Sequence, residues 1–236
     1  MKVVAIVQAR LGSTRLPRKV LADVGGRPMI ARVLERAAAI RGVDLTVAAV
    51  PLGEWELGAA IAEAGFLCYY GASDDVLARY ARIATMLRAS IVIRITGDCP
   101  LLAPDVSRDV LRVFLHAGDY DYVSNVGPGT DGLDTEVFST VALLEANATG
   151  ARDDHDREHV TPAIRRAADE AGRAGVVAVP RGGCPVKLSV DEYEDLDRVR
   201  RIYGALDATV AGWRDWPATR AALEGAGLWS PVTPRP

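Results

Sequence analysis

A basic stretch near the N-terminus, Q-A-R-L-G-S-T-R-L-P-R-K over residues 8–19, has the composition of an anion-binding loop. Its cations surround a glycine and two hydroxyl side chains: Arg10, Arg15, Arg18 and Lys19 around Gly12, Ser13 and Thr14. Glycine lets a ligand approach the backbone closely, while hydroxyl and amide groups donate hydrogen bonds beside the fixed charges. A polyphosphate suits this chemistry. The alternative is a solvated basic loop closed by Pro17, and the spacings of the P-loop and of G-x-G-x-x-G are absent.

Two aspartates further along the chain have the positions of metal ligands. Asp98 follows the apolar run I-V-I-R-I, and Asp191 follows K-L-S-V. If both runs are strands of one largely parallel sheet, their carboxyl ends open on the same crevice as Gly12. Mg²⁺ prefers oxygen ligands and commonly takes one or two protein carboxylates together with substrate phosphates. We therefore predict a magnesium site at Asp98 and Asp191; as the alternative, each caps a turn or the helix that follows it.

The acidic segment D-G-L-D-T-E offers side chains for a second substrate. Asp131, Asp134 and Glu136 would line the pocket of an acceptor molecule. The alternative is an Asp-Gly turn followed by an ordinary strand, and the residues alone leave the two open.

Two histidines, His155 and His159, have the i, i+4 spacing that can bind zinc. The sequence shows no third ligand and no H-E-x-x-H. Helix capping by Asp153, Asp154 or Asp156 is therefore favoured, with Arg157 and His159 contacting an acceptor or a partner.

The elements that position these residues alternate regularly in the first half of the chain. Short apolar runs predict strands over residues 3–7, 45–50, 66–70 and 91–95, and periodic stretches predict helices over 28–40, 55–63, 74–87 and 104–115. Such repeats imply right-handed crossovers and a mostly parallel sheet. The basic loop then lies at the carboxyl end of the first strand, where open α/β sheets bind ligands.

The second half is less regular. Strands are expected over residues 122–124, 136–138, 176–179 and 186–190. One helix is expected to follow Asp153-Asp154, contain His159 and end near Gly172, and another to cover 194–206. The last thirty residues carry Trp213, Trp216 and Trp229 around a short helix, and we expect an apolar cap on the domain or on a twin subunit. The whole chain, residues 1–236, is predicted to be one α/β domain with residues 207–236 as a C-terminal helical appendage.

Composition narrows the class of protein. The 236 residues carry a net charge of -3 with a sequence pI near 5.7, so no global positive field favours nucleic acid or an anionic membrane. No apolar run reaches the roughly 18 residues of a membrane span, and the N-terminus lacks the pattern of a signal peptide. Three widely spaced cysteines, Cys68, Cys99 and Cys184, suit free thiols in a reducing cytoplasm.

The opening V-A-I-V-Q-A-R-L-G-S-T-R-L-P-R-K-V-L-A-D-V-G-G-R-P-M-I resembles the start of cytidylyltransferases that make CMP-activated acidic sugars, such as CMP-Kdo synthetases. The likeness is strongest to the SpsF-type spore-coat polysaccharide branch. It continues through I-T-G-D-C-P-L-L, D-Y-V-S-N, D-G-L-D-T-E-V-F-S, D-R-E-H-V-T-P and K-L-S-V-D-E-Y-E-D-L. These motifs, in this order, are specific for the family and not for the substrate.

The resemblance implies a three-layer α/β sandwich of the nucleotide-diphospho-sugar transferase type, which is GT-A-like and Rossmann-like. It also implies a reaction of CTP with an acidic or hydroxylated acceptor, giving a CMP conjugate and pyrophosphate, in the synthesis of a surface glycan. The implied nucleotide-binding residues are Gln8, Ala9, Arg10, Gly12, Ser13, Lys19, Thr96, Gly97 and Asp98, with Arg10, Arg15, Lys19 and Asp98 catalytic. Asp98 and Asp191 would hold Mg²⁺, and Asp131, Asp134, Glu136 and His159 would bind the acceptor.

Two details of the basic loop follow from the same reasoning. The loop is expected to face solvent, so loss of Lys19 should affect phosphate binding far more than folding. Arg18 occupies a position where the family motif more often has glycine, which leaves its role open between a phosphate contact and solvent.

Rival functions on a related architecture are a glycosyltransferase, for which Asp119-Tyr120-Asp121 offers a D-x-D, and a non-catalytic nucleotide-sensing protein. The D-x-D follows an expected helix end rather than a strand that enters the cleft. The acceptor itself, the preference for CTP over UTP beyond the family likeness, and a homodimer suggested by the apolar tail stay open.

Overall fold

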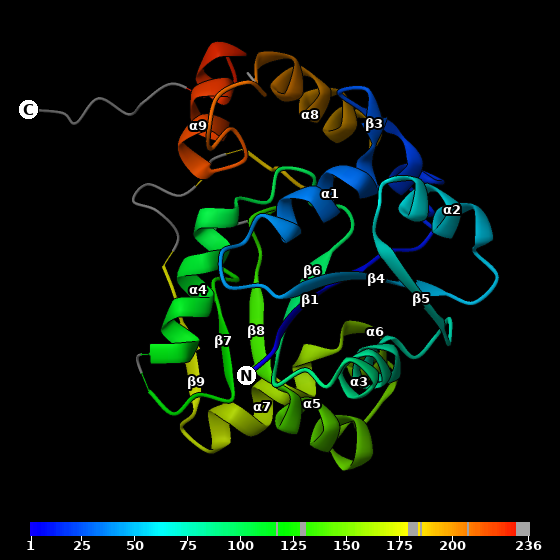
Figure 1. Ribbon diagram of the computed structural model, residues 1–236, viewed down its shortest axis with the longest axis vertical. Coiled ribbons are helices and arrows are strands. Elements are labelled where there is room, and N and C mark those ends of the chain that lie inside the picture. Colours follow the sequence, from blue (N-terminus) through cyan, green and yellow to red (C-terminus); the bar gives the residue numbers. More distant parts are fainter. Residues whose placement is uncertain (117, 128–130, 179–183, 185, 207, 230–236) are drawn as a thin grey trace, which may run out of the picture.

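The computed structural model describes residues 1–116, 118–127, 131–178, 184, 186–206 and 208–229. One sheet is formed by β1 (Val3–Gln8), β4 (Leu45–Pro51), β5 (Leu67–Gly71), β6 (Ile91–Thr96), β7 (Tyr122–Ser124), β8 (Glu136–Ser139) and β9 (Ala174–Val176). Their order is β5-β4-β1-β6-β8-β7-β9 (Figure 1). The first four are parallel, β8 is antiparallel to both β6 and β7, and β9 is parallel to β7.

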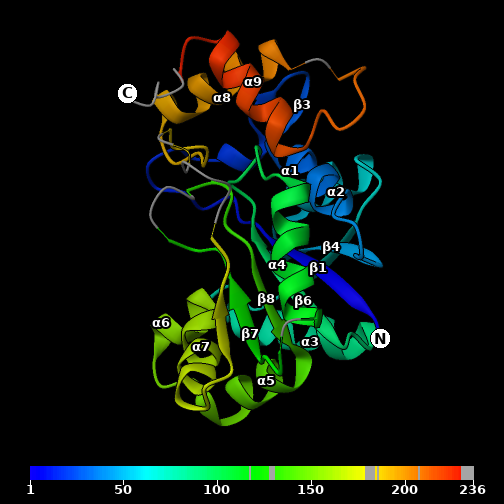
Figure 2. The ribbon, with the colours of Figure 1, turned by 90° about the vertical axis from the view of Figure 1, so that its left-hand side faces the viewer.

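Helices cover both faces of the sheet, which gives three layers (Figures 1 and 2). The apolar side chains of α1 (Met29–Ala38), α2 (Trp55–Glu63), α4 (Pro104–His116), α8 (Tyr193–Ala205) and α9 (Trp216–Gly225) belong to one core. Those of α3 (Val76–Leu87), α5 (Thr140–Glu145) and α7 (Thr161–Glu170) belong to the other. Short connecting elements are η1 (Lys19–Leu21), the β2 (Asp23–Val24) and β3 (Arg27–Pro28) pair, η2 (Ala146–Gly150) and α6 (Asp154–His159).

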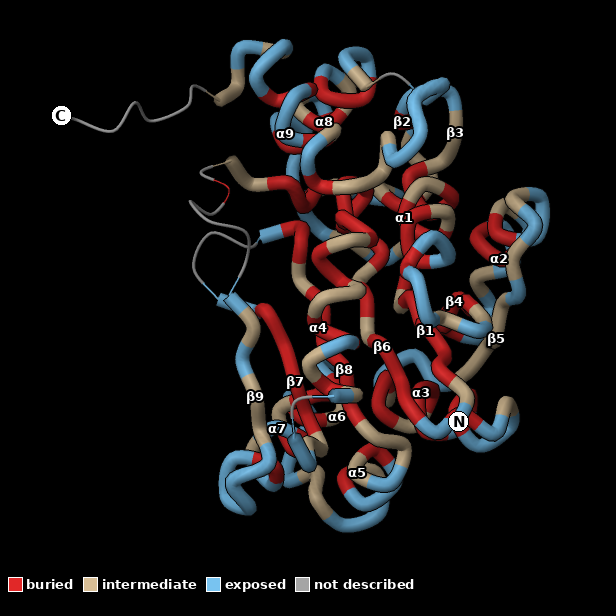
Figure 3. Tube along the Cα trace, turned by 60° about the vertical axis from the view of Figure 1, so that its left-hand side comes forward, coloured by how far each residue is buried: buried red, intermediate tan, exposed pale blue. Residues whose placement is uncertain are grey.

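The central strands are apolar on both faces because both faces are covered. In β1, Val3, Ala5 and Val7 face the first core, whereas Val4 and Ile6 face the second. Figure 3 shows β1 and β6 buried along most of their length. A parallel sheet between two helical layers has this continuous hydrophobicity, and the alternation of short apolar runs with amphipathic helices predicted it.

The single helix predicted to follow Asp153-Asp154 and end near Gly172 is wrong as one element. Val160, with φ 69° and ψ −56°, separates α6 from α7. The physical reason is Pro162, which has no N–H to donate and whose ring would clash with the carbonyl of Glu158 in a continuous helix.

Two predicted strands also differ from the structure. Residues 186–190, all of them described, lie in an irregular segment rather than a strand. The strand expected over 176–179 overlaps β9, which covers Ala174–Val176, at Val176 alone. Residues 177 and 178 are not in a strand, and residue 179 lies outside the described part.

The C-terminal segment packs on its own domain. Asp105 at the start of α4 accepts a hydrogen bond from the backbone N–H of Trp216 at 2.8 Å, and the Trp216 side chain is buried. The fully buried Arg36 of α1 donates to the carbonyl oxygen of Arg214 at 2.7 Å. The tail therefore caps this domain, which was the first of the two expected alternatives, and it gives no argument for a second subunit. None of the helices in the described part has the length and apolar character needed to cross a bilayer.

Candidate active site

A pocket of about 360 Å³ lies at the carboxyl ends of β1 and β6. The predicted nucleotide- and metal-binding residues all line it: Gln8, Ala9, Arg10, Gly12, Ser13, Arg15, Lys19, Thr96, Gly97, Asp98 and Asp191. His159, predicted to bind the acceptor, lines it as well. The structure thus brings together residues that are up to 183 positions apart in the sequence, between Gln8 and Asp191.

The basic loop is fixed by a carboxylate from the neighbouring strand connection. Both oxygens of Glu54 lie 3.0 Å from the backbone nitrogen of Leu11. The carbonyl oxygen of Leu11 in turn accepts from the nitrogens of Ser13, at 2.8 Å, and Arg18, at 3.1 Å. Burial raises the pKa of Glu54, against the opposing effects of the Leu11 N–H and of Arg79 and Arg10. The loop is therefore a folded turn that presents its cations and hydroxyls to the pocket.

Lys19 joins the two predicted metal ligands. Its Nζ atom donates to Asp98 Oδ2 at 3.0 Å, to Asp191 Oδ1 at 3.1 Å and to the carbonyl oxygen of Val190 at 2.6 Å. Only 11% of the Lys19 side chain is exposed. The expectation that Lys19 faces solvent is thus wrong: the ammonium group is enclosed because it compensates two carboxylates that would otherwise repel each other.

Asp191 is an ionised carboxylate in a basic setting. Its Oδ1 also lies 3.0 Å from Arg15 Nη2, and Lys187 Nζ donates to its Oδ2 at 2.8 Å. Burial acts to raise the pKa of Asp191, but the hydrogen bonds from Lys187 and Lys19 outweigh burial and lower it. The group therefore keeps its negative charge at neutral pH.

The backbone around Asp191 is held by Asp195 and by Asp98. Asp195 Oδ2 accepts from Lys187 Nζ at 2.7 Å and from the backbone nitrogens of Asp191 and Glu192 at 2.9 and 3.1 Å. These contacts lower the pKa of Asp195 to about 2, although its burial acts in the opposite direction. The nitrogen of Val190 donates to the carbonyl oxygen of Asp98 at 2.9 Å. Because Glu192 is the N-cap of α8, the capping alternative for Asp191 does not hold.

Glu136 is buried and is not among the described residues that line the pocket. Its carboxylate pairs with Arg94 of β6, and its Oε1 accepts from the Tyr122 hydroxyl at 2.7 Å. Arg94 lines the pocket and also donates from Nε to Gln8 Oε1 at 3.2 Å. The prediction that Glu136 contacts the acceptor gives way to a supporting role, because its neighbours on β6 and β7 already use its oxygens.

Asp131 and Asp134 support the segment that carries Asp191. The Ser189 hydroxyl donates to Asp131 Oδ1, and the nitrogen of Leu188 donates to the Asp131 carbonyl oxygen at 2.9 Å. Asp134 Oδ2 lies 3.3 Å from the nitrogen of Gly132. Neither aspartate is among the described residues that line the pocket. Asp131 thus belongs to a turn that fixes residues 188–190, and acceptor contacts of the two aspartates stay a prediction.

Gly132 shows how closely this turn is fitted. Its φ is +94°, and a Cβ atom added there would lie 2.5 Å from the carbonyl carbon of Leu188. Glycine is therefore required at this position both by the backbone angle and by the approach of the second segment.

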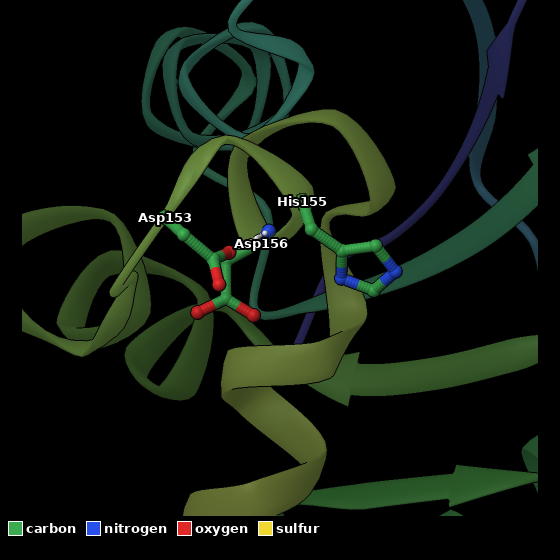
Figure 4. A group of neighbouring side chains, drawn as sticks. All are labelled: Asp153, His155 and Asp156. Atoms are coloured by element: carbon green, nitrogen blue, oxygen red, sulfur yellow. Dashed lines mark hydrogen bonds between the residues drawn. The ribbon is translucent and has the colours of Figure 1, made fainter.

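His155 and His159 lie in a helix, α6, that is capped by Asp153. The sequence favoured such a helix cap over a zinc site. Asp153 is the N-cap of α6 and accepts from the nitrogen of Asp156 at 2.9 Å, while Asp156 binds Arg166 through both oxygens. Figure 4 shows the carboxylates of Asp153 and Asp156 close together, with the His155 ring beside them. Asp153 and His155 are exposed and Asp156 is buried. Because both carboxylates are committed to protein donors, the group has the chemistry of a helix cap.

The far wall of the pocket is formed by Arg79, Arg94, Glu158 and His159. Glu158 Oε1 forms an exposed ion pair with Arg10 Nη2 at 3.1 Å. Burial lowers the pKa of His159, and the nearby charges of His155, Arg94 and Arg10 lower it further against the opposing effect of Glu158. The imidazole is therefore neutral at pH 7.

Sequence reasoning missed Arg79, Arg94 and Glu158. A signal existed for Arg94, which interrupts the apolar strand I-V-I-R-I-T and must find a partner when that strand is buried. Arg79 likewise lies beside the buried Leu77 and Tyr80 in the first turns of α3. A cation inside an apolar pattern marks either a buried ion pair or a ligand contact.

Comparisons with known proteins agree with this geometry. A sequence profile of the family described as "Cytidylyltransferase" matches residues 4–203. The chain is 30% identical over 209 residues to the spore coat polysaccharide biosynthesis protein SpsF of Bacillus subtilis (strain 168), covering 85% of this chain and 86% of the relative.

Two solved structures share the fold. A cytidylyltransferase from Leptospira borgpetersenii superposes with a TM-score of 0.87 at 22% identity, over 100% of both chains. A CMP:2-keto-3-deoxy-manno-octonic acid synthetase complexed with CTP has a TM-score of 0.66 at 20% identity, over 86% of this chain and 99% of that one. The profile match and the similarity to SpsF place this chain in the cytidylyltransferase family of enzymes.

Proposed function

We propose that this protein transfers the CMP group of CTP to an acidic sugar or a related small acceptor, with release of pyrophosphate, in the synthesis of a surface glycan. The observation that carries the proposal is the convergence of a basic, hydroxyl-rich loop and two carboxylates in one pocket. Lys19 contacts both Asp98 and Asp191 there, Arg15 contacts Asp191, and Arg10 lines the same pocket. This is the donor set that a triphosphate and a divalent cation require together.

The arginines of the basic loop can exchange their present carboxylate partners for phosphate oxygens. Arg10 and Arg15 each have 58% of the side chain exposed in their ion pairs with Glu158, Asp191 and Glu192. Exposed pairs of this kind contribute little, about 0–1 kcal/mol, so a triphosphate can displace them at small cost. The hydroxyls of Ser13 and Thr14, which line the pocket, add neutral donors.

Magnesium is the metal that we propose for Asp98 and Asp191. Their oxygens approach one common position, since Asp98 Oδ2 and Asp191 Oδ1 both lie about 3 Å from Lys19 Nζ. Two carboxylates combined with substrate phosphates are a usual Mg²⁺ ligand set. When bound, the ion would neutralise charge on the phosphoryl oxygens.

The reaction forms a bond between an acceptor oxygen and the α-phosphorus and breaks the bond from that phosphorus to the bridging oxygen, which leaves with pyrophosphate. The chain's contribution is to align the two substrates and to stabilise the charge on the departing group. For a hydroxyl acceptor, the neutral His159 on the pocket wall is suited to take the proton. An acceptor already ionised at pH 7 needs no base.

The rival D-x-D segment has other contacts. Asp121 pairs with Arg173, and its backbone nitrogen donates to the Arg173 carbonyl oxygen at 3.0 Å. These contacts belong to the junction of β7 and β9, and neither Asp119 nor Asp121 is among the described residues that line the pocket. A sugar-nucleotide glycosyltransferase is therefore disfavoured.

A screen of pyrophosphate release tests the proposal. The four ribonucleoside triphosphates are incubated with Mg²⁺ and each of a set of sugar acids that includes 2-keto-3-deoxy-manno-octonic acid. We expect acceptor-dependent release with CTP above all, and a CMP conjugate detectable by mass spectrometry. Transfer from a sugar nucleotide, without release from CTP, would support the glycosyltransferase instead.

A further inference from the structure

Arg79 is a buried cation at the pocket wall. It lies in the first turns of α3, has 3% of its surface exposed and lines the pocket. Its Nε and Nη1 atoms are buried and have no hydrogen-bond partner within the described residues. An enclosed guanidinium with free donors is costly unless an oxygen acceptor compensates it.

The other pocket arginines are compensated by the protein. Arg94 pairs with Glu136, Arg10 with Glu158, and Arg15 with Asp191. An acid close to Arg79 is Glu54, whose two oxygens are both directed at the nitrogen of Leu11. Burial lowers the pKa of Arg79, yet a guanidinium remains charged at neutral pH. Its charge is thus available to a ligand.

Arg79 is separated from the carboxylates by the centre of the sheet. A Cβ atom added to Gly71 at the end of β5 would lie 2.6 Å from Arg79 Cγ, so the arginine stem lies over that strand end. The strand order β5-β4-β1-β6 places this end on one side of β1, while Asp98 follows β6 on the other. Val76, the first residue of α3, also lines the pocket, so the positive end of the helix adds to the charge of Arg79.

We propose that Arg79 forms an oxyanion subsite that takes a carboxylate or phosphate group of a substrate, across β1 from Lys19, Asp98 and Asp191. This inference rests on the proposed function and specifies the substrate: one that carries a second anionic group in addition to the phosphates held by the basic loop. Two groups have this chemistry, the carboxylate of an acidic acceptor and the terminal phosphate of CTP. A planar guanidinium can bind either with two parallel hydrogen bonds.

Four variants test the subsite. Arg79→Met removes the charge and keeps most of the stem, and Arg79→Lys keeps a charge without the planar fork. Gly71→Ala keeps the arginine but forces its stem to move, because the added Cβ would lie 2.6 Å from Arg79 Cγ. Arg82→Met is the matched control, because Arg82 is an exposed arginine on the same helix. Thermal unfolding accompanies each variant, and Arg79→Met should unfold at the wild-type temperature or above, because it removes a buried charge without a partner.

Two measurements distinguish the acceptor carboxylate from the terminal phosphate of CTP as the anion that Arg79 binds. The first is calorimetric titration with CTP, CDP or CMP in the presence of Mg²⁺, and the second is the acceptor KM in the pyrophosphate assay. A loss of about ten- to a hundredfold in CTP affinity with unchanged CDP affinity assigns the terminal phosphate. Unchanged nucleotide affinities with an acceptor KM raised by the same factor assign the carboxylate. Arg79→Lys and Gly71→Ala should show smaller losses in the same measurement, and Arg82→Met none.

Two results would overturn the subsite. Equal losses for CTP, CDP and CMP would mean that Arg79 contacts the base or ribose, and wild-type values throughout in a folded Arg79→Met protein would mean that it contacts nothing. If the wild-type protein binds CTP but releases no pyrophosphate with any acid, the proposed function fails separately. The nucleotide titrations then decide alone, and unchanged CTP affinity would overturn the subsite as well.

Discussion

Arg94 of β6 and Glu136 of β8 form an ion pair across two antiparallel strands, with 13% and 8% of their side chains exposed. Arg94 lines the pocket, whereas Glu136 accepts a hydrogen bond from the hydroxyl of the buried Tyr122. The pair therefore links the chemistry of the pocket to the stability of the sheet.

Replacing Glu136 by glutamine should destabilise the protein strongly, because it leaves the Arg94 charge without its partner. We expect a loss of about 3 kcal/mol in the free energy of unfolding by urea, the lower end of the range for breaking a buried pair, since glutamine keeps an acceptor oxygen. Asp169→Asn, which breaks the exposed pair with Arg165, is the control and should cost less than about 0.5 kcal/mol. A raised acceptor KM at wild-type stability would instead return Glu136 to the acceptor site.

Lys19→Met should impair both folding and catalysis. The ammonium group compensates Asp98 and Asp191, so its loss leaves two carboxylates facing each other, at a cost of about 1.5–3 kcal/mol in unfolding free energy. Turnover should fall as well. Arg15→Met removes an exposed cation of the same loop and should reduce turnover with little change in stability. Equal stability losses in the two variants would contradict the enclosed position of Lys19.

Asp98 and Asp191 should behave as one unit. Asp98→Asn and Asp191→Asn should each remove most Mg²⁺-dependent turnover, and the double variant should be only slightly worse, because residues that act together are not additive. Steady-state kinetics against Mg²⁺ concentration, with a chelator as the metal-free reference, measure this. If Asp191→Asn keeps normal turnover and loses only thermal stability, the residue supports the structure and does not bind metal.

Arg18→Gly should stabilise the protein. Arg18 has φ 61° and ψ 21°, a left-handed conformation that costs a non-glycine residue about 1 kcal/mol, and its side chain pairs with the exposed Glu56 rather than lining the pocket. We expect a gain of up to about 1 kcal/mol in chemical denaturation and unchanged turnover. Arg18→Ala, which removes the same pair but keeps a Cβ atom, should bring no gain. Lost turnover in Arg18→Gly would indicate a phosphate contact.

Acid should weaken the segment around Asp191 through Asp195. The pKa of Asp195 in the folded protein is about 2, below the roughly 3.9 of an unfolded chain. Its carboxylate therefore stabilises the fold above about pH 4, and this contribution, about 2 kcal/mol, is lost as the pH falls towards 2. Asp195→Asn should flatten the unfolding free energy over this range, whereas Asp169→Asn should keep the wild-type slope. An unchanged slope in Asp195→Asn would refute the assignment.

The parallel half of the fold and the basic loop could be predicted because their causes are local. Strands buried on both faces are continuously apolar, and a loop at the end of β1 has a fixed relation to the ends of its neighbours. Asp98 was placed correctly for this reason. Asp191 was also placed correctly, although the premise that it follows a strand was wrong. Residues 186–190 form no strand and are held by hydrogen bonds to the backbone of Asp98 and Asp131.

Side-chain partners could not be predicted where they depend on pairing between distant segments. In E-V-F-S the alternation places Glu136 on the same face as the apolar Phe138, which already argued for burial. Its partner Arg94 becomes evident only when β6 and β8 are known to be adjacent. The break at Val160 was in contrast readable from Pro162, which the periodic pattern around it concealed.

Lys19 and Asp191 are separated by 172 positions, and their contact has a consequence for the timing of activity during synthesis. Bacterial and eukaryotic ribosomes add about 5–20 residues per second, so the loop emerges on the order of ten to thirty seconds before its second carboxylate. A nascent chain can complete its four parallel strands in that interval while its active site is still unmade. Catalytic competence thus requires that the segments carrying Lys19 and Asp191 have folded together.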